Sequence, residues 1–218
     1  MRNFFSGGSK SGHARDKGSD HSVRHSSGWK EMLKHLQRRE SLRVLDIGPT
    51  SSANINFITG MGHSIYMSNL VEEAARPEWT KRDADGEPQF DTLGFLDANL
   101  QFSGRMFDVI LLWDASDYMP AMLLPQLIHR LHRVMAGEAQ MLAFFHAKPT
   151  AGLSAPLIDN GFFRYNLTGD ETVDLQRVGH FPILSMYTNR QIETLLKDFS
   201  NFRFFLAKDN LREVLATK

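Results

Sequence analysis

Hydrophobic residues in this chain gather in short runs that alternate with stretches of helical spacing. The segment "MFDVILLWD" at residues 106–114 is the clearest run, and its nearly continuous apolar character is typical of a parallel strand covered on both faces. Residues 124–134 instead place apolar residues three or four positions apart, which predicts an amphipathic helix that stops at Gly137. By the same criteria we expect strands at 42–47, 63–68, 93–96 and 140–146, helices at 27–39, 53–61 and 189–199, and two final strands on either side of residues 208–210.

Strands that alternate with helices predict an α/β fold with a doubly wound, mostly parallel sheet. The seven expected strands form this sheet, and the last two of them form a C-terminal antiparallel hairpin. Residues 150–180 interrupt the alternation. There, "FFRYNLTGDETVDLQRV" alternates apolar and polar positions around Gly169-Asp170, which predicts an inserted β-hairpin.

One domain accounts for most of the chain. At 218 residues there is room for one α/β domain, which we place at residues 27–218. Residues 1–26 are rich in Ser, Gly and charge and poor in apolar residues, so a disordered basic arm is predicted there. The sequence has no cysteine, which excludes disulfides and thiolate chemistry, and no apolar run of membrane-spanning length. We expect a cytoplasmic protein, and the sequence indicates no oligomeric state.

The net charge of zero hides an uneven distribution. Residues 1–43 carry ten Lys and Arg against four Asp and Glu, whereas residues 44–218 carry 15 against 21. A basic segment on an acidic body is found in proteins that bind nucleic acid or acidic partners. This segment lacks a dense basic block and interleaved aromatic residues, so we favour a solvated tail over a nucleic-acid-binding one.

Polar residues follow several of the expected strands, at the edge of the sheet where ligands bind. In doubly wound sheets, that place is the crevice outside the carboxyl ends of the strands, beside the first strand. The sequence therefore predicts that one crevice gathers residues 46–52, 68–69, 97 and 113–118.

Four segments give the chain a resemblance to a known family. They are "VLDIG" at the end of the first strand, "FDVILLWD" as the fourth, "VMAGEAQMLAFF" leading into the fifth, and the terminal antiparallel pair. Over residues 28–218 the chain resembles the class I S-adenosylmethionine-dependent methyltransferases. The resemblance implies S-adenosylmethionine as the cofactor and methyl transfer, by in-line displacement, to an acceptor that the sequence does not identify.

The resemblance also implies a set of cofactor-binding residues. Asp46 and Gly48 match the family's glycine motif, whereas Thr50 and Ser52 occupy its later glycine positions. Thr50 is β-branched and unfavourable at positive φ, so a turn of different shape is expected, and Thr50 or Ser51 can instead cap the following helix. The implied set is completed by Asn69 in place of the ribose-binding acid, by Asp97 and Ala98 for the adenine, and by Trp113.

The same resemblance places substrate-facing residues at the ends of the fourth and fifth strands. Asp114 and His146 are the candidate catalytic residues there, with a satisfied rim histidine as the alternative for His146 and a helix cap as the role expected of Asp117. No metal site is expected. The arm and the inserted hairpin are predicted to form a lid. The second hypothesis is a non-catalytic methyltransferase-like binding or scaffold protein, because both the glycine loop and the ribose acid are altered.

Overall fold

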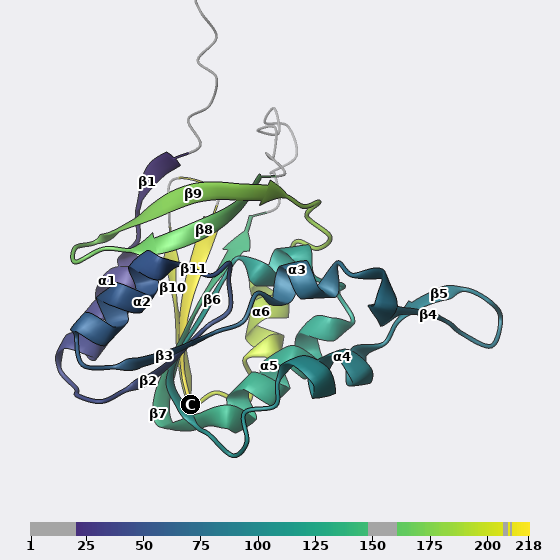
Figure 1. Cartoon of the computed structure of the whole chain (residues 1–218), viewed down its shortest axis with the longest axis horizontal. Helices are drawn as coiled ribbons and strands as arrows, with labels where there is room; N and C mark the ends of the chain where they lie inside the picture. Colours follow the sequence, from purple (N-terminus) through teal and green to yellow (C-terminus); the bar gives the residue numbers. More distant parts are fainter. Residues whose placement is uncertain (1–20, 148–160, 207–208, 210) are drawn as a thin grey trace, which may run out of the picture.

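A six-stranded sheet forms the centre of the structure (Figure 1), a computed structural model that describes residues 21–147, 161–206, 209 and 211–218. Four adjacent strands are parallel, and the last two along the chain are antiparallel, as predicted. The spatial order is β10 (Asn201–Leu206), β11 (Leu211–Thr217), β7 (Met135–His146), β6 (Phe107–Trp113), β2 (Arg43–Asp46) and β3 (Ser64–Met67).

Each face of this sheet is covered by helices, and each has its own buried core. Side chains alternate along the strands, so that Leu111 of β6 faces one core and Ile110 faces the other. One face carries α1 (Ser27–Gln37) and α2 (Ser52–Gly60). The opposite face carries α3 (Leu70–Ala74), α4 (Thr92–Asn99), α5 (Leu123–Val134) and α6 (Asn189–Leu195).

A second sheet lies across the carboxyl ends of the parallel strands (Figure 1). It is three-stranded and antiparallel, with the order β1 (His21–His25), β9 (Thr172–His180) and β8 (Gly161–Leu167). The β8–β9 pair is the inserted hairpin that the sequence predicts, with Gly169-Asp170 in its turn. Its predicted range begins at residue 150, and residues 150–160 lie outside the described residues.

The arm predicted at residues 1–26 includes a strand. Residues 21–25 form β1, which pairs with β9 from His21 opposite Gln176 to His25 opposite Thr172. Arg24 is the buried residue of β1. The remainder of the predicted arm, residues 1–20, lies outside the described residues.

The seventh strand predicted at residues 93–96 is wrong, because these residues belong to α4. The Asp91 side chain accepts a hydrogen bond from the Gly94 backbone N–H and caps this helix. Between α3 and α4 lie a short 3₁₀ turn, η1 (Pro77–Trp79), and a hairpin of β4 (Thr80–Arg82) and β5 (Pro88–Phe90). This hairpin projects from the body of the molecule (Figure 1).

The helix predicted to stop at Gly137 ends earlier. Helix α5 ends at Val134, and β7 begins at the next residue, so Gly137 lies within the strand. No described helix has the length and apolar character needed to cross a membrane.

Candidate functional site

The crevice at the end of β2 is centred on the carboxylate of Asp46. Asp46 is 1% exposed. Its Oδ1 accepts a hydrogen bond from the Trp113 indole Nε1 at 2.7 Å, and its Oδ2 accepts one from the Asn54 side-chain Nδ2 at 2.9 Å. Burial raises the pKa of Asp46 to about 6, even though both hydrogen bonds favour the charged form. The protein therefore supplies partners to both oxygens of the acid that the sequence assigns to a cofactor.

Trp113 closes the crevice from the side of β6. Its φ is 51°, in the left-handed region that costs a non-glycine residue about 1–2 kcal/mol, and a register irregularity in β6 precedes it. In this conformation the indole stacks on the Tyr165 ring of β8, with centroids 4.8 Å apart and planes 3° from parallel. A Cβ atom on Gly48 would lie 3.1 Å from Trp113 Cδ1, so the indole fills the space beside this glycine.

Asn54 fastens β8 over the crevice. Its Nδ2 also donates to the Tyr165 carbonyl at 2.9 Å, and its Oδ1 accepts from the Leu167 backbone N–H at 2.8 Å. Next to it, the Ser51 hydroxyl caps α2, as one of the alternatives from the sequence expects, and donates to the Asn166 side chain at 2.7 Å. The edge of β8 is thus tied to the first turn of α2 by buried polar contacts.

In the described conformation, the protein itself covers two of the residues that the sequence assigns to S-adenosylmethionine. Asp46 is buried and hydrogen-bonded to Trp113 and Asn54, and the Trp113 indole lies beside Gly48 and stacks on Tyr165 of β8. In this conformation Asp46 and Gly48 therefore do not present an open cofactor site. No reaction step through the cofactor follows from this arrangement.

The remaining predicted cofactor residues are Thr50, Ser52, Asn69, Asp97 and Ala98. Thr50 and Ser52 are exposed at the start of α2. Asn69 caps α3, where its side chain accepts from the Glu72 N–H and donates to the Glu72 carboxylate.

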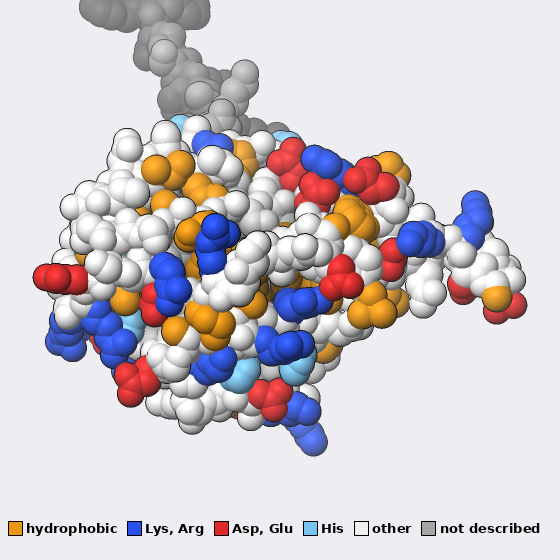
Figure 2. All heavy atoms as spheres, turned by 60° about the horizontal axis from the view of Figure 1, so that its bottom comes forward, with side chains coloured by type: hydrophobic (Ala, Val, Ile, Leu, Met, Phe, Trp, Pro, Cys, Tyr) orange, Lys and Arg blue, Asp and Glu red, His pale blue; other side chains and the backbone are white. Residues whose placement is uncertain are grey.

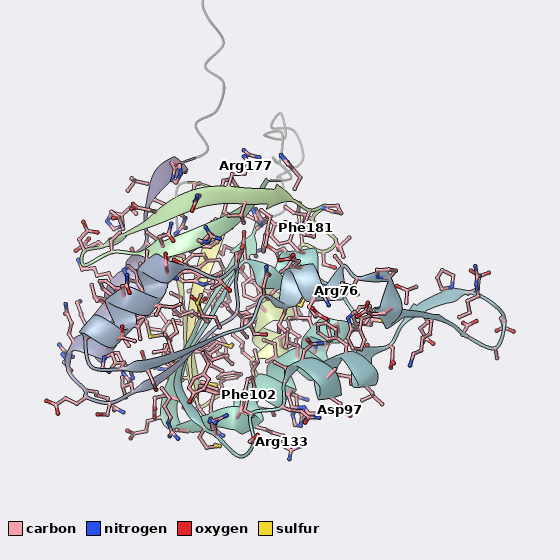
Figure 3. All side chains as sticks on the ribbon, in the orientation of Figure 1. Arg76, Asp97, Phe102, Arg133, Arg177 and Phe181 are labelled. Atoms are coloured by element: carbon pink, nitrogen blue, oxygen red, sulfur yellow. The ribbon has the colours of Figure 1, made fainter. Side chains whose placement is uncertain are left out.

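Asp97 and Ala98 are in α4, and the Asp97 carboxylate pairs with Arg130 of α5. Figure 3 shows Asp97 in the lower part of the view and Arg177 of β9 at the top. The crevice lies under β8 and β9, so the structure does not bring Asp97 to it.

A second polar group lies at the carboxyl ends of β6 and β7 and contains both predicted catalytic residues. Asp114 and Asp117 are buried, and the side chain of His146 is 19% exposed. The Asp117 Oδ2 accepts hydrogen bonds from the His146 backbone N–H at 2.6 Å and from its Nδ1 at 2.8 Å. The expected helix cap is therefore wrong for Asp117, whose carboxylate orients the imidazole. Asp117 belongs to the short 3₁₀ turn η2 (Ala115–Tyr118) after β6.

The charges of this group are coupled. Burial raises the pKa of Asp114 to about 6, against the opposing effect of His146, and burial also raises the pKa of Asp117. Burial lowers the pKa of His146, but the hydrogen bond to Asp117 and the nearby charge of Asp114 outweigh it, so that this pKa is raised. A histidine oriented through Nδ1 by a carboxylate presents Nε2 for proton transfer.

No group of His, Asp and Glu side chains in the described part of the chain has the geometry to hold a metal ion. Asp114, Asp117 and His146 are included in this statement, since all three are described. Their arrangement fits hydrogen bonding and proton transfer.

Comparison with known proteins gives matches in structure. No protein-family model matches the chain, and no curated protein matches its sequence. A solved S-adenosylmethionine-dependent methyltransferase from Methanosarcina mazei is 16% identical, with a TM-score of 0.48 over 85% of this chain and 96% of that one. The magnesium protoporphyrin IX methyltransferase of Synechocystis, solved with bound S-adenosylmethionine, is 12% identical, with a TM-score of 0.45 over 88% and 80%.

A further match is an O-methyltransferase candidate from Nostoc punctiforme, 13% identical, with a TM-score of 0.46 over 88% of this chain. This chain spans 56% of the length of that protein.

The sequence did not indicate the role of three residues at the crevice. They are Ser51 and Asn54, which hold β8 in place, and Tyr165 of β8 itself. Asn54 and Ser51 stand three positions apart at a helix start, which in sequence indicates only a cap. Tyr165 lies in an alternating strand, where an aromatic residue indicates packing. Their shared role depends on β8 crossing α2, and no local pattern carries that information.

Proposed function

We propose that this protein is a non-catalytic binding or scaffold module with a methyltransferase-like fold. We also propose that the crevice at the end of β2 does not bind S-adenosylmethionine. One observation carries the proposal. The Asp46 carboxylate is buried and receives both of its hydrogen bonds from the protein, from Trp113 and Asn54. Because Asp46 is closed to solvent, a ligand could reach it only by moving Trp113 or Asn54, and a buried carboxylate deprived of these donors is costly.

Further contacts that hold the covering sheet to the rest of the structure support this proposal. Beyond Asn54, the Trp29 indole donates to the Thr168 carbonyl at 3.1 Å, and the Ser26 N–H donates to the Glu171 carbonyl at 2.8 Å. Arg24 of β1 forms a buried ion pair with Glu213 of β11. Lifting β8 and β9 breaks buried polar contacts at α1 and α2 together with the stack of Tyr165 on Trp113.

A methyltransferase that acts on an unidentified acceptor is the second candidate. The pairing of His146 with Asp117 favours it, because an oriented, partly exposed imidazole at the rim is suited to remove or deliver a proton. This candidate requires a conformation in which the crevice beside Asp46 is open.

Isothermal titration calorimetry with S-adenosylmethionine and S-adenosylhomocysteine separates the two candidates. For the wild-type chain we expect no saturable heat at millimolar ligand. Saturable binding that is lost in Asp46→Asn, with the fold intact by circular dichroism, would refute the proposal and support the methyltransferase.

The variant Trp113→Gly tests the cause of the exclusion. It removes the indole and relieves the positive φ, so any residual affinity of the crevice should appear in this variant first. Trp79→Ala, which removes a partly buried indole in η1, is the control for the general loss of an aromatic side chain.

A further inference from the structure

A basic cleft lies between α1 and the C-terminal half of the central sheet, away from the crevice. Its volume is about 330 Å³, and residues of α1, β7, β10 and β11 line it. This volume lies at the lower end of the range for small-molecule sites. The cations that line it are Lys34, Arg38, Arg39 and Arg203.

The cations outnumber the carboxylates at this cleft. Glu31 is the lining acid, and it pairs with Lys34 at 2.7 Å and with Arg203 at 3.4 Å. Outside the lining, Glu138 pairs with Arg39 at 3.4 Å, and both side chains are largely exposed. In the described part of the chain, Arg38 forms no ion pair. Four cations thus share two carboxylates, and the excess positive charge faces the cleft.

One of these cations is held in position by its neighbours. The Arg203 guanidinium lies over the Phe205 ring, 4.5 Å from the centroid, while Glu31 binds it from α1. Arg203 stands on β10 and Arg38 near the end of α1, so two separate elements present their guanidinium groups to the same space. Convergence of this kind suits an anion that is contacted from two sides.

Two buried polar atoms of the lining have no partner within the described residues. They are Nε2 of His35 and Oε1 of Gln140. Buried polar atoms of this kind are normally paired with protein, water or ligand. Both atoms are closed to solvent, so the guanidinium groups are the part of the lining that a ligand can reach.

We propose that this cleft is a binding site for a small phosphate-bearing molecule, such as a nucleoside monophosphate or sugar phosphate. The phosphate is held by Arg38 and Arg203, with Lys34 and Arg39 at the rim. Figure 2 shows Lys and Arg side chains interspersed with acidic ones over one face of the molecule, rather than joined in one broad basic surface. A small ligand in a cleft fits that distribution better than an extended nucleic acid. The residues that line this cleft are different from those of the crevice at the end of β2.

Calorimetric titration of the full chain with adenosine monophosphate, sodium pyrophosphate and a short single-stranded oligothymidylate tests the proposal. We expect the monophosphate to bind saturably, and the double variant Arg38→Gln/Arg203→Gln to bind it at least about tenfold more weakly. Arg133→Gln, an exposed arginine of α5, is the matched control and should change the affinity less than about twofold. Glu31→Gln frees Lys34 and Arg203, so it should tighten binding by up to about fivefold.

Three results would overturn the proposal. The first is the absence of binding by the wild-type chain, and the second is equal weakening by the control and the double variant. The third is binding of the oligonucleotide alone with a steep dependence on salt, which would assign the cleft to nucleic acid. Binding of pyrophosphate with the same affinity as the monophosphate would support the proposal, because it would show that the phosphate groups are what the cleft recognises.

Discussion

Replacing Asn54 by Ala tests whether β8 is a fixed part of the structure. Asn54 is 1% exposed, and its side chain makes hydrogen bonds to Asp46, to the Tyr165 carbonyl and to the Leu167 N–H. The variant leaves the two backbone groups buried without partners, at about 1–3 kcal/mol each, and removes one bond from Asp46. Alanine regains about 0.5 kcal/mol of helix propensity. We expect the free energy of unfolding to fall by about 3–5 kcal/mol.

Urea unfolding followed by far-UV circular dichroism measures this change, with the m-value as a check that unfolding stays two-state. Asn56→Ala is the matched control, because Asn56 is an exposed residue of the same helix with the same side chain. It should alter the free energy of unfolding by no more than about 0.5 kcal/mol. A loss below about 1 kcal/mol for Asn54→Ala would show that β8 is held weakly, and the crevice would then be open to a ligand at little cost.

Three further predictions concern buried charges. Glu213→Gln weakens the buried ion pair with Arg24, so the free energy of unfolding in urea should fall by about 3 kcal/mol or more. A fall of less than about 1 kcal/mol would show that this ion pair does not hold β1 in place. Asp117→Asn should lower the pKa of His146, read by NMR titration of the imidazole, and an unchanged pKa would show that the carboxylate does not control the ring. Because burial raises the folded pKa of both Asp114 and Asp46 to about 6, the folded state binds these protons more tightly, so each acid should lower stability by up to about 3 kcal/mol between about pH 4 and 6 as pH rises. Asp114→Asn should remove the Asp114 part of that slope and leave the Asp46 part, and a slope unchanged by it would show that Asp114 does not titrate in this range.

Much of the fold could be predicted from hydrophobic runs whose length and pattern fit one type of secondary structure. The run at residues 106–114 is apolar at nearly every position, and β6 is indeed buried on both faces. At residues 93–96 the run is too short to separate a strand from a helix. In the structure this run belongs to a helix, which Asp91 caps. The helix buries Phe95 and Leu96 and leaves Leu93 67% exposed. Asp91 before Thr92 was the local signal for a helix start.

Strand β1 shows what lies beyond local patterns. Residues 21–25 are almost entirely polar, and Val23, its apolar residue, is 70% exposed. The strand exists because β9 offers an edge and because Glu213 binds Arg24. Both partners come from the far end of the chain, so composition alone predicts disorder there.

The altered glycine motif has a physical explanation that the sequence does not reveal. In sequence, Asp46 and Gly48 look like the retained half of a cofactor loop, and Thr50 and Ser52 like its lost half. In the structure the retained residues serve the protein itself. Asp46 binds Trp113 and Asn54, and Gly48 is small because the Trp113 indole lies 3.1 Å from where its Cβ would be. Internal packing alone therefore accounts for both retained residues, so their presence is not by itself an argument for cofactor binding.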